Sequence, residues 1–485
     1  MDFLKWGVVL DKKQLKQILD NALSTGGDFA EIFIEEKETT GIGYEDQKIE
    51  KLNSGIDIGA GIRVISGDTT AYVYTNVVTT EELGYIAQVA SKVAQSEQKS
   101  YTLDFTTPEA ILDFEITLRP DQIKIEDKIE KVMEVEKAAR SVDEKIKQVA
   151  VSYGDIRQKV IIANSEGNYV EDERIRTRIA CNSIASDGEA IQTGFTSLGG
   201  TKGFEIFKDK DSSDLGLESG ELALLMLKAQ PSPSGKMPVV MAAEAGGTMV
   251  HEACGHGLEA DLAQKGLSVY ANKRSEKVAS ELITVIDDPT IPYKYGSYRY
   301  DDEGTVARKN VLINQGFLEN YMYDKLTAKK EGVQSTGNGR RESYKYRPIP
   351  RMTNTYIAKG KDKQEEIIKS TKKGLYVKRM GGGQVNTTNG DYVFDVAEGY
   401  LIENGETTYP VKGATLTGNG PETLQMVEMV GNDLGFAIGT CGKEGQGAPV
   451  SDAQPTIKIK ELIVGGTARM DEDNQLNRDF KIRRI

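Results

Sequence analysis

Long apolar runs are absent from this sequence. The longest apolar stretches have the length of a strand, as in MPVVMAA (237–243), whereas a membrane-spanning helix needs roughly 18 or more apolar residues. The short run WGVVL (6–10) lacks the length of a signal-peptide core and the small residues of a cleavage site. We therefore expect a cytoplasmic protein that has no membrane partner.

Cysteines and basic clusters are scarce as well. The three cysteines, Cys181, Cys254 and Cys441, are far apart and odd in number, which argues against a disulfide framework and indicates a reducing compartment. Lys and Arg number 61 against 74 Asp and Glu, giving a net charge of −13, and the basic residues are scattered. Because a nucleic-acid partner requires a basic stripe, we expect no nucleic acid as the main partner.

The remaining composition is ordinary for a globular protein, with 38% hydrophobic residues, 28% charged residues and a mean hydropathy of −0.43. A chain of 485 residues has room for two or three domains with cores of their own. Segments that alternate with period two, separated by Gly, Asn and Asp, are typical of meandering strands. The expected elements are helices 11–27, 80–95 and 125–141 and strands 29–39, 41–55, 56–68, 69–78, 146–155, 159–175 and 177–188.

This order of elements divides the N-terminal part into two similar sub-units, about 1–97 and 123–228. The stretch KAQPSPSGKMP (228–238) is typical of a linker and separates an N-terminal domain (1–230) from a C-terminal domain (236–485) that is rich in glycine and strand patterns. We predict an α+β fold. Its N-terminal α+β domain has an antiparallel sheet, and its strand-rich C-terminal domain carries a short bulged metal-binding helix.

Histidine is the scarce residue that carries the functional prediction. Only two histidines occur, and both lie in TMVHEACGHGLEADLA (248–263), as His251 and His256. In an HExxH motif, a spacing of four residues places two imidazoles about 40° apart around a helix. The spacing of five found here would separate them by roughly 140° in a regular α-helix. A single wider turn with i→i+5 hydrogen bonds restores a shared face, and we predict such a turn.

Two imidazoles leave a catalytic zinc site incomplete, because such a site usually has three protein ligands and an open position for water. The spacing leaves four candidates open for the third ligand: Glu259, Asp261, Cys254 and Cys441. Glu252 directly follows the first histidine, as in zinc peptidases whose glutamate takes a proton from the metal-bound water. The predicted reaction is hydrolysis of a peptide or related amide bond. A structural metal site and a chance pair of histidines remain alternatives.

Several longer stretches resemble those of one protein family. They are HEACGHGLEAD (251–261), YRYDDEGT (298–305), STGNGRRESYKYRPIPRMTNTYI (335–357), EGYLIENGE (398–406), PVKGATLTGNGPETL (410–424) and GTCGKEGQGAPVSDAQPTI (439–457). Together they span most of residues 236–465, and the N-terminal α+β pattern agrees with the same family. The chain resembles the TldD/PmbA family of modulators of DNA gyrase, on its metal-bearing TldD side.

This resemblance implies a zinc metallopeptidase that acts on unfolded or extended peptides, with one Zn²⁺ per active chain. It also implies that the cysteine of GTCGK, Cys441, is the third metal ligand, which leaves Cys254 and Cys181 to packing. Metal-bearing members of the family pair with members that lack the motif. A dimer is therefore implied, either with a second copy or with a metal-lacking PmbA/TldE-type subunit. An exposed strand edge could hold an extended peptide through main-chain hydrogen bonds.

Other side chains are candidates for roles around the metal. An oxyanion formed during hydrolysis is stabilised by hydrogen-bond donors, and the candidates are Tyr344, Arg340, Arg341 and Lys443. The stretch RRESYKYR (340–347) also fits a solvated basic segment with no such role. Histidine ligands also require carboxylates that orient their imidazole rings, and the candidates are Asp301, Asp302 and Glu303.

Two other functions remain open. One is a non-catalytic peptide-binding or scaffold subunit with a structural metal. The other is a peptidase of the dipeptidyl-peptidase III type, whose third ligand is a glutamate.

Overall fold

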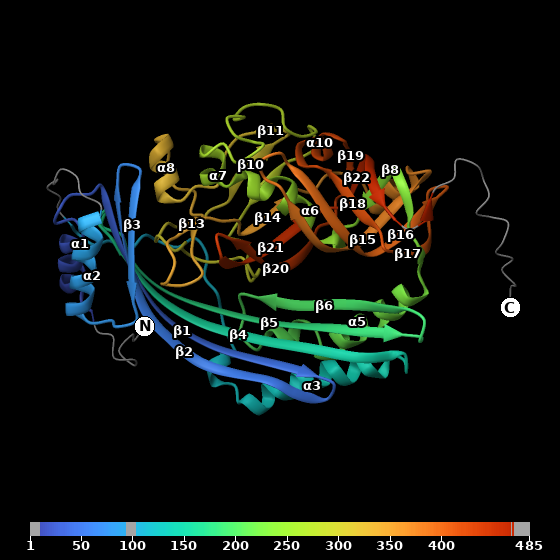
Figure 1. Ribbon diagram of the computed structural model, residues 1–485, viewed down its shortest axis with the longest axis horizontal. Helices are drawn as coiled ribbons and strands as arrows, with labels where there is room; N and C mark the ends of the chain where they lie inside the picture. Colours follow the sequence, from blue (N-terminus) through green and yellow to red (C-terminus); the bar gives the residue numbers. More distant parts are fainter. Residues whose placement is uncertain (1–9, 94–102, 467, 470–485) are drawn as a thin grey trace, which may run out of the picture.

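The computed structural model describes residues 10–93, 103–466 and 468–469. Its N-terminal half contains one long antiparallel sheet with the strand order β3-β2-β1-β4-β5-β6 (Figure 1). The strands are β1 Phe29–Glu45, β2 Lys48–Ser66, β3 Thr69–Thr75, β4 Ile146–Asn164, β5 Tyr169–Ser186 and β6 Ile191–Gly200. Because β1 pairs with β4, the strands of the two predicted sub-units form a single sheet.

Helices cover the sheet in two pairs. Helices α1 (Lys12–Ala22) and α2 (Thr80–Val93) pack against β1–β3, and α3 (Ile125–Ser141) and α5 (Ser212–Lys228) pack against β4–β6. Each pair encloses its own hydrophobic core. Helix α1 shows why this sequence forms a helix, since Asp11 caps its first turn and apolar residues recur at helical spacing. The buried ones are Leu15, Ile18, Leu19 and Ala22.

The strand boundaries differ from the sequence-based expectation at two turns. The chain turns between β1 and β2 at Asp46 and Gln47, which have φ angles of 46° and 65°. The expected strand 41–55 therefore contains the hairpin turn, and 56–68 continues β2. Similarly, the turn between β4 and β5 falls inside the expected strand 159–175. Both turns interrupt the alternation with consecutive polar residues or glycine, at 45–48 and 164–168, and the expected strands run through them.

Two larger sheets and a two-stranded ribbon form the C-terminal half. The first sheet has the order β11-β10-β9-β14-β21-β20, and the second has the order β15-β8-β22-β18-β16-β17-β7 with β19 and β23 attached. A further pairing between β15 and β16 closes part of the second sheet on itself. Together with the antiparallel N-terminal sheet, this strand-rich half confirms the predicted α+β fold.

The remaining bounds are β7 Gln230–Pro231, β8 Pro233–Met241, β9 Val285–Asp287, β10 Asn310–Asn314, β11 Phe317–Leu318, β12 Gly339–Arg340, β13 Ile349–Pro350, β14 Asn354–Ile357, β15 Lys373–Val385, β16 Asp391–Glu403, β17 Glu406–Lys412, β18 Thr415–Asn419, β19 Val427–Val430, β20 Gly435–Lys443, β21 Gln446–Gln454, β22 Ile457–Gly465 and β23 Ala468–Arg469. The short helices are α4 Ile206–Asp209, α6 Thr248–Val250, α7 Ala260–Gln264, α8 Lys325–Glu331, α9 Gln364–Lys369 and α10 Gly420–Gln425. Within the described ranges, no helix is long and apolar enough to cross a membrane.

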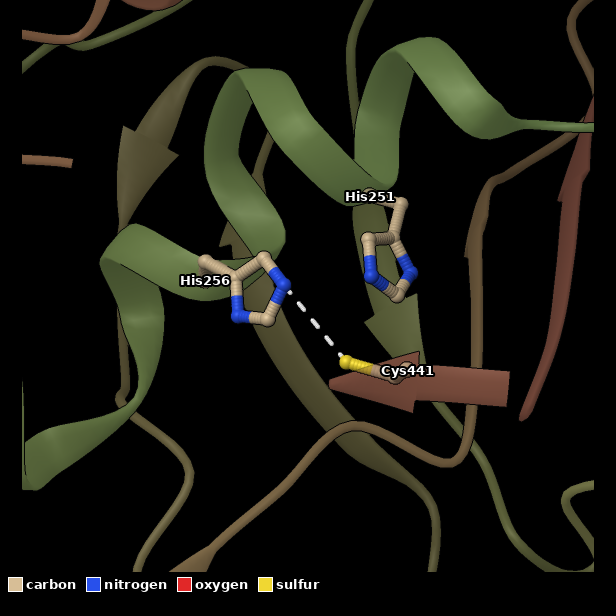
Figure 2. A group of neighbouring side chains, drawn as sticks. All are labelled: His251, His256 and Cys441. Carbon is tan, nitrogen blue, oxygen red and sulfur yellow. Dashed lines mark hydrogen bonds between the residues drawn. The ribbon is translucent and has the colours of Figure 1, made fainter. Parts of the chain in front are cut away.

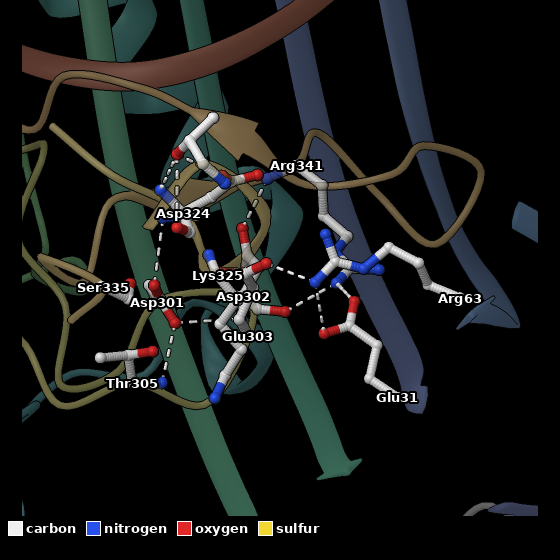
Figure 3. Close-up of polar contacts among 12 residues, drawn as sticks. Glu31, Arg63, Asp301, Asp302, Glu303, Thr305, Asp324, Lys325, Ser335 and Arg341 are labelled. Atoms are coloured by element: carbon white, nitrogen blue, oxygen red, sulfur yellow. Dashed lines mark hydrogen bonds and ion pairs between the residues drawn. The ribbon is translucent and has the colours of Figure 1, made fainter. Parts of the chain in front are cut away.

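Buried ion pairs join the N-terminal sheet to the C-terminal half (Figure 3). Arg63 of β2 binds Glu31 of β1 at 3.0 Å and also binds Glu303 of the C-terminal half. Arg341 binds the other oxygen of Glu31 at 2.6 Å. All four side chains are almost inaccessible to solvent, and a small apolar cluster that includes Tyr344 lies between the same two parts. Burying these charges is tolerable only because each has a partner.

Candidate metal centre

The two histidines lie on a short distorted helix that follows β8 and a tight glycine turn. Gly246 and Gly247 have φ angles of 76° and 80°, a conformation that favours glycine. A Cβ on Gly247 would lie 2.3 Å from the backbone nitrogen of Ala453 on β21, so only glycine permits this close approach. The helix therefore packs directly against the sheet that contains β20 and β21.

The helix contains the predicted wider turn. Residues 251–255 form one π-turn, closed by a hydrogen bond from the backbone N–H of His256 to the carbonyl of His251. The i→i+5 prediction is therefore confirmed. A Cβ at Gly255 would lie 2.2 Å from Sδ of Met352, so a larger residue there would require the buried methionine to shift.

The π-turn brings the imidazoles together, and β20 adds a sulfur atom (Figure 2). The ring centroids of His251 and His256 are 4.9 Å apart. Sγ of Cys441 lies 3.5 Å from Nε2 of His256. One ligand atom from each of these three residues lies within 4.8 Å of the other two, so the three atoms can surround a single ion.

Two carboxylates orient the imidazole rings. Nδ1 of His251 lies 3.0 Å from Asp452 of β21, and Nδ1 of His256 lies 3.1 Å from Glu259. With Nδ1 engaged in each ring, Nε2 is the nitrogen left for an ion, which is the usual arrangement at metal sites with histidine ligands.

The charges of the three side chains depend on one another. Burial raises the pKa of Cys441, but hydrogen bonds and charge interactions with His251 and His256 outweigh it and bring the pKa down to about 5. Burial lowers the pKa of His256, but Glu259 and Cys441 raise it to about 9. At neutral pH the thiolate of Cys441 therefore pairs with protonated imidazoles, and a bound cation would displace the protons from the imidazole nitrogens. Two imidazole nitrogens and one thiolate form a donor set that fits zinc.

The other candidates for the third ligand have different partners. Sγ of Cys254 donates to the carbonyl of Val250 at 3.4 Å, and burial raises the pKa of this thiol. Asp261 binds Nζ of Lys443 at 2.6 Å, and Glu259 binds the far side of His256. Cys181 is fully buried in the core under α3 and α5, in agreement with a packing role.

Glu252 and the three donor residues line a cavity of about 740 Å³. The rest of its wall comes mainly from β20 and from the glycine-rich segment 381–385 of β15. Burial raises the pKa of Glu252, and the neighbouring charges of His251 and His256 offset part of that rise. In the described part of the chain, no hydrogen bond or salt bridge engages this carboxylate. Glu252 is therefore available to accept a proton in the cavity.

The structure brings only one of the four expected oxyanion donors to the metal cavity. Lys443 lines the cavity, but its ammonium group is held by Asp261 and, at 3.1 Å, by Glu259. Tyr344 lies outside the cavity and donates its hydroxyl hydrogen bond to Asp57 at 3.0 Å. Arg340 and Arg341 lie outside it as well, and both are buried rather than part of a solvated stretch.

The expected orienting carboxylates also lie elsewhere. Asp302 binds Arg174 and accepts the backbone N–H of Arg341. Glu303 binds Arg63 (Figure 3). Asp301 accepts backbone N–H groups, including that of Gly339 at 3.0 Å. The side chains of Asp302 and Glu303 thus join the two halves of the molecule, and Asp452 and Glu259 take the positions next to the histidines. The only sequence signal for Asp452 was its place in the same signature stretch as Cys441.

Family models match three consecutive parts of the chain. Residues 30–94 match domain 1, residues 118–227 the central domain, and residues 234–466 the C-terminal domain of the PmbA/TldA metallopeptidases. A metalloprotease TldD homolog of Haemophilus influenzae is 37% identical over 467 residues, which cover 94% of this chain and 97% of that protein. The chain belongs to the PmbA/TldD family.

More distant relatives agree with this assignment. A zinc metalloprotease TldD homolog of Saccharolobus solfataricus is 28% identical, covering 87% of this chain and 93% of that protein. Two solved structures share the fold. One is a candidate modulator of DNA gyrase from Thermotoga maritima, with a TM-score of 0.78, 22% identity and coverage of 94% of this chain and 100% of that chain. The other is TldE from Thermococcus kodakarensis, with a TM-score of 0.76, 20% identity and coverage of 93% and 100%. Membership in this family supports a metallopeptidase activity.

Proposed function

We propose that this chain is a zinc metallopeptidase that hydrolyses extended peptides and that His251, His256 and Cys441 hold one Zn²⁺. The observation that carries the proposal is the convergence of these three donor atoms within 4.8 Å of one another beside an unengaged glutamate. Three protein ligands leave an open coordination position, which distinguishes a catalytic zinc site from a closed structural one. When bound, zinc supplies a Lewis acid that lowers the pKa of water and polarises a carbonyl group.

Glu252 is the proposed general base. Its carboxylate lies on the wall of the cavity, one residue after His251, and its pKa is raised by burial. A carboxylate with a raised pKa is a stronger base at neutral pH than an exposed one, which suits the removal of a proton from an attacking water molecule. The same group can then pass that proton to the leaving amine.

An extended substrate fits the position of β20. This strand forms one edge of its sheet, carries Cys441, and lines the cavity over residues 437–443. A peptide in the cavity can pair with such an edge through main-chain hydrogen bonds, which recognise the backbone and tolerate different side chains. A folded substrate lacks a free backbone for this pairing, so the proposed substrates are unfolded peptides.

The proposed active form is a dimer, either with a second copy or with a metal-lacking subunit of the PmbA/TldE type. The β1–β2 hairpin supports this because it exposes Ile49, Leu52 and Ile56 by 45%, 49% and 46%. Large apolar side chains grouped on one exposed surface are typical of protein–protein contacts. The molar mass of the purified chain, alone and mixed with such a subunit, tests this part. A mass of one chain under both conditions would contradict it. The three free cysteines fit the proposed cytoplasmic location.

The Glu252→Gln variant tests the catalytic assignment. Glutamine has the shape of glutamate but cannot accept the proton, so peptide turnover should fall by about 10²- to 10⁴-fold while zinc content stays near one per chain. A Glu244→Gln variant, which changes a carboxylate outside the donor set, is the matched control and should keep its turnover. If the Glu252→Gln variant hydrolysed peptides at the rate of the unmodified chain, the base would be a different residue.

A further inference from the structure

A second cavity, of about 230 Å³, lies between the N-terminal sheet and the C-terminal half, outside the metal centre. Four buried arginines contribute to its wall, and we call it the cationic cavity. The arginines are Arg174 and Arg176 of β5, Arg340 of β12, and Arg341. Lys37 also lines it, and the acidic residues of the wall are Asp301, Asp302 and Glu342.

Two of the four arginines have carboxylate partners that account for their charge. Arg174 binds Asp172 at 2.9 Å and also binds Asp302. Arg341 binds Glu31 at 2.6 Å. Because a buried guanidinium group needs a counter-charge, these pairs explain why both side chains can lie in the interior.

Arg176 and Arg340 lack such a partner. Arg176 is 6% exposed and donates to the carbonyls of Tyr295 and Ser297, at 3.1 Å and 3.3 Å. Arg340 is 4% exposed and donates to the carbonyls of Met352 and Pro449, at 2.5 Å and 2.8 Å. No carboxylate in the described residues forms a salt bridge with either. Burial and then the positive charges of Arg340 and Arg174 lower the pKa of Arg176 to about 10, so the group carries unfavourable charge interactions.

The nearby acidic groups have other partners and form no salt bridge with Arg176 or Arg340. Asp302 is already bound to Arg174. The carboxylate of Asp301 accepts backbone N–H groups at 2.8 Å to 3.0 Å. Glu342 accepts the backbone N–H of Gly447 at 2.6 Å. The cationic cavity therefore contains two guanidinium groups that form no salt bridge within the described residues, although Asp302 offsets part of the positive charge of each.

We propose that the cationic cavity binds a small oxyanion, a carboxylate or a phosphate group, between Arg176 and Arg340. Guanidinium groups match the geometry of both oxyanions, because their planar N–H groups can donate two parallel hydrogen bonds. Two donors, Nη1 of Arg176 and Nε of Arg340, form no hydrogen bond with the described residues. Thr440 lines both this cavity and the metal cavity, so the anion site adjoins the strand that carries Cys441. The proposal goes beyond peptide hydrolysis and does not depend on it.

The direct test is a titration of the full chain with inorganic phosphate, at constant ionic strength maintained with chloride. Calorimetry should show saturable binding, and the thermal unfolding temperature should rise with phosphate concentration, since a ligand that binds only the folded state stabilises it. The His256→Ala variant should keep this binding, which separates the cationic cavity from the metal centre. Absence of saturable binding by phosphate and by succinate would overturn the proposal, as would loss of all binding in His256→Ala.

Variants locate the site. Arg176→Gln and Arg340→Gln should each weaken phosphate binding by roughly tenfold or more, because each removes charge-assisted hydrogen bonds. Arg119→Gln is the matched control, since Arg119 is paired with Glu173 and does not line the cavity, and this variant should bind phosphate like the unmodified chain. If a glutamine variant fails to fold, Arg176→Lys keeps the charge, loses the planar donors and should show intermediate affinity. Equal phosphate affinity in every variant would contradict the assignment to these two arginines.

A second titration identifies the source of the oxyanion. Peptides with a free C-terminal carboxylate are compared with their C-terminally amidated forms in competition with phosphate. If only the free carboxylate competes, the site binds a peptide terminus. If neither form competes while phosphate and succinate bind, the site binds a free small anion. Both results support the oxyanion site, and competition by both peptide forms equally would contradict it.

Discussion

The carboxylate behind His251 offers a sharp test of how the metal centre is organised. Asp452 lies 3.0 Å from Nδ1 of His251 and makes no other side-chain hydrogen bond in the described residues. Replacing it with asparagine keeps an oxygen that can accept the Nδ1–H hydrogen bond and removes only the negative charge. Loss of such a partner typically lowers metal affinity by about 10- to 100-fold, which corresponds to about 1.4–2.8 kcal/mol. Since asparagine preserves the geometry, we expect Asp452→Asn to lie near the tenfold end.

The assay is competition for zinc between the protein and a chelating dye, which gives a dissociation constant for each variant. Asp57→Asn is the control, because Asp57 pairs with Lys345 and does not line the metal cavity, so its replacement should leave the zinc affinity unchanged. Glu259→Gln is less informative. Glu259 is fully buried and also pairs with Lys443, so its loss leaves part of a buried charge uncompensated and affects folding as well. An unchanged zinc affinity in folded Asp452→Asn would refute the orienting role.

Two further predictions concern the cysteines and the pH dependence of stability. Cys441→Ser should lower zinc affinity by at least about tenfold in the same dye assay, because a hydroxyl group is a much weaker zinc ligand than a thiolate. Cys254→Ser should leave the zinc affinity nearly unchanged. Equal losses of affinity in the two variants would contradict the assignment of Cys441. Burial raises the pKa of Glu173, but Arg119 and Arg157 outweigh this effect and lower it to about 2, from an ordinary value of 4.5. A lowered carboxyl pKa stabilises the fold above the unfolded-state pKa, and this contribution is lost as the pH falls from about 4.5 towards 2. In denaturant unfolding, Glu173→Gln should therefore be less stable than the unmodified chain at pH 7, and the difference should shrink across that window; a difference independent of pH would contradict the argument.

Local patterns predicted the part of the metal centre that is local in sequence. The five-residue spacing of His251 and His256 required a wider turn, and the π-turn at 251–255 has that geometry. Helix 125–141 was predicted with the bounds that the structure shows, because its apolar spacing and its flanking residues lie within one segment. The proposed third ligand, Cys441, came from a resemblance to known sequences, since spacing alone left four candidates open.

The pairing of distant strands determines which charged residues meet, and local sequence patterns do not show this pairing. Asp452 reaches His251 because β20 and β21 pair beside the helix, across 201 positions of sequence. Asp302 and Glu303 lie between the two halves of the molecule, where buried arginines of the N-terminal sheet bind them. Arg341 likewise binds Glu31, which is 310 positions away. A single sequence shows that these residues are charged, but the register of distant strands determines which charges meet.

The most direct test of the central claim is metal content measured together with peptide cleavage on the same preparation of the full chain. The account predicts about one zinc ion per active chain, loss of cleavage of an unstructured peptide when zinc is chelated, and recovery when zinc is restored. Full cleavage activity in a preparation with no bound metal, or full metal content in a variant lacking both His256 and Cys441, would contradict it.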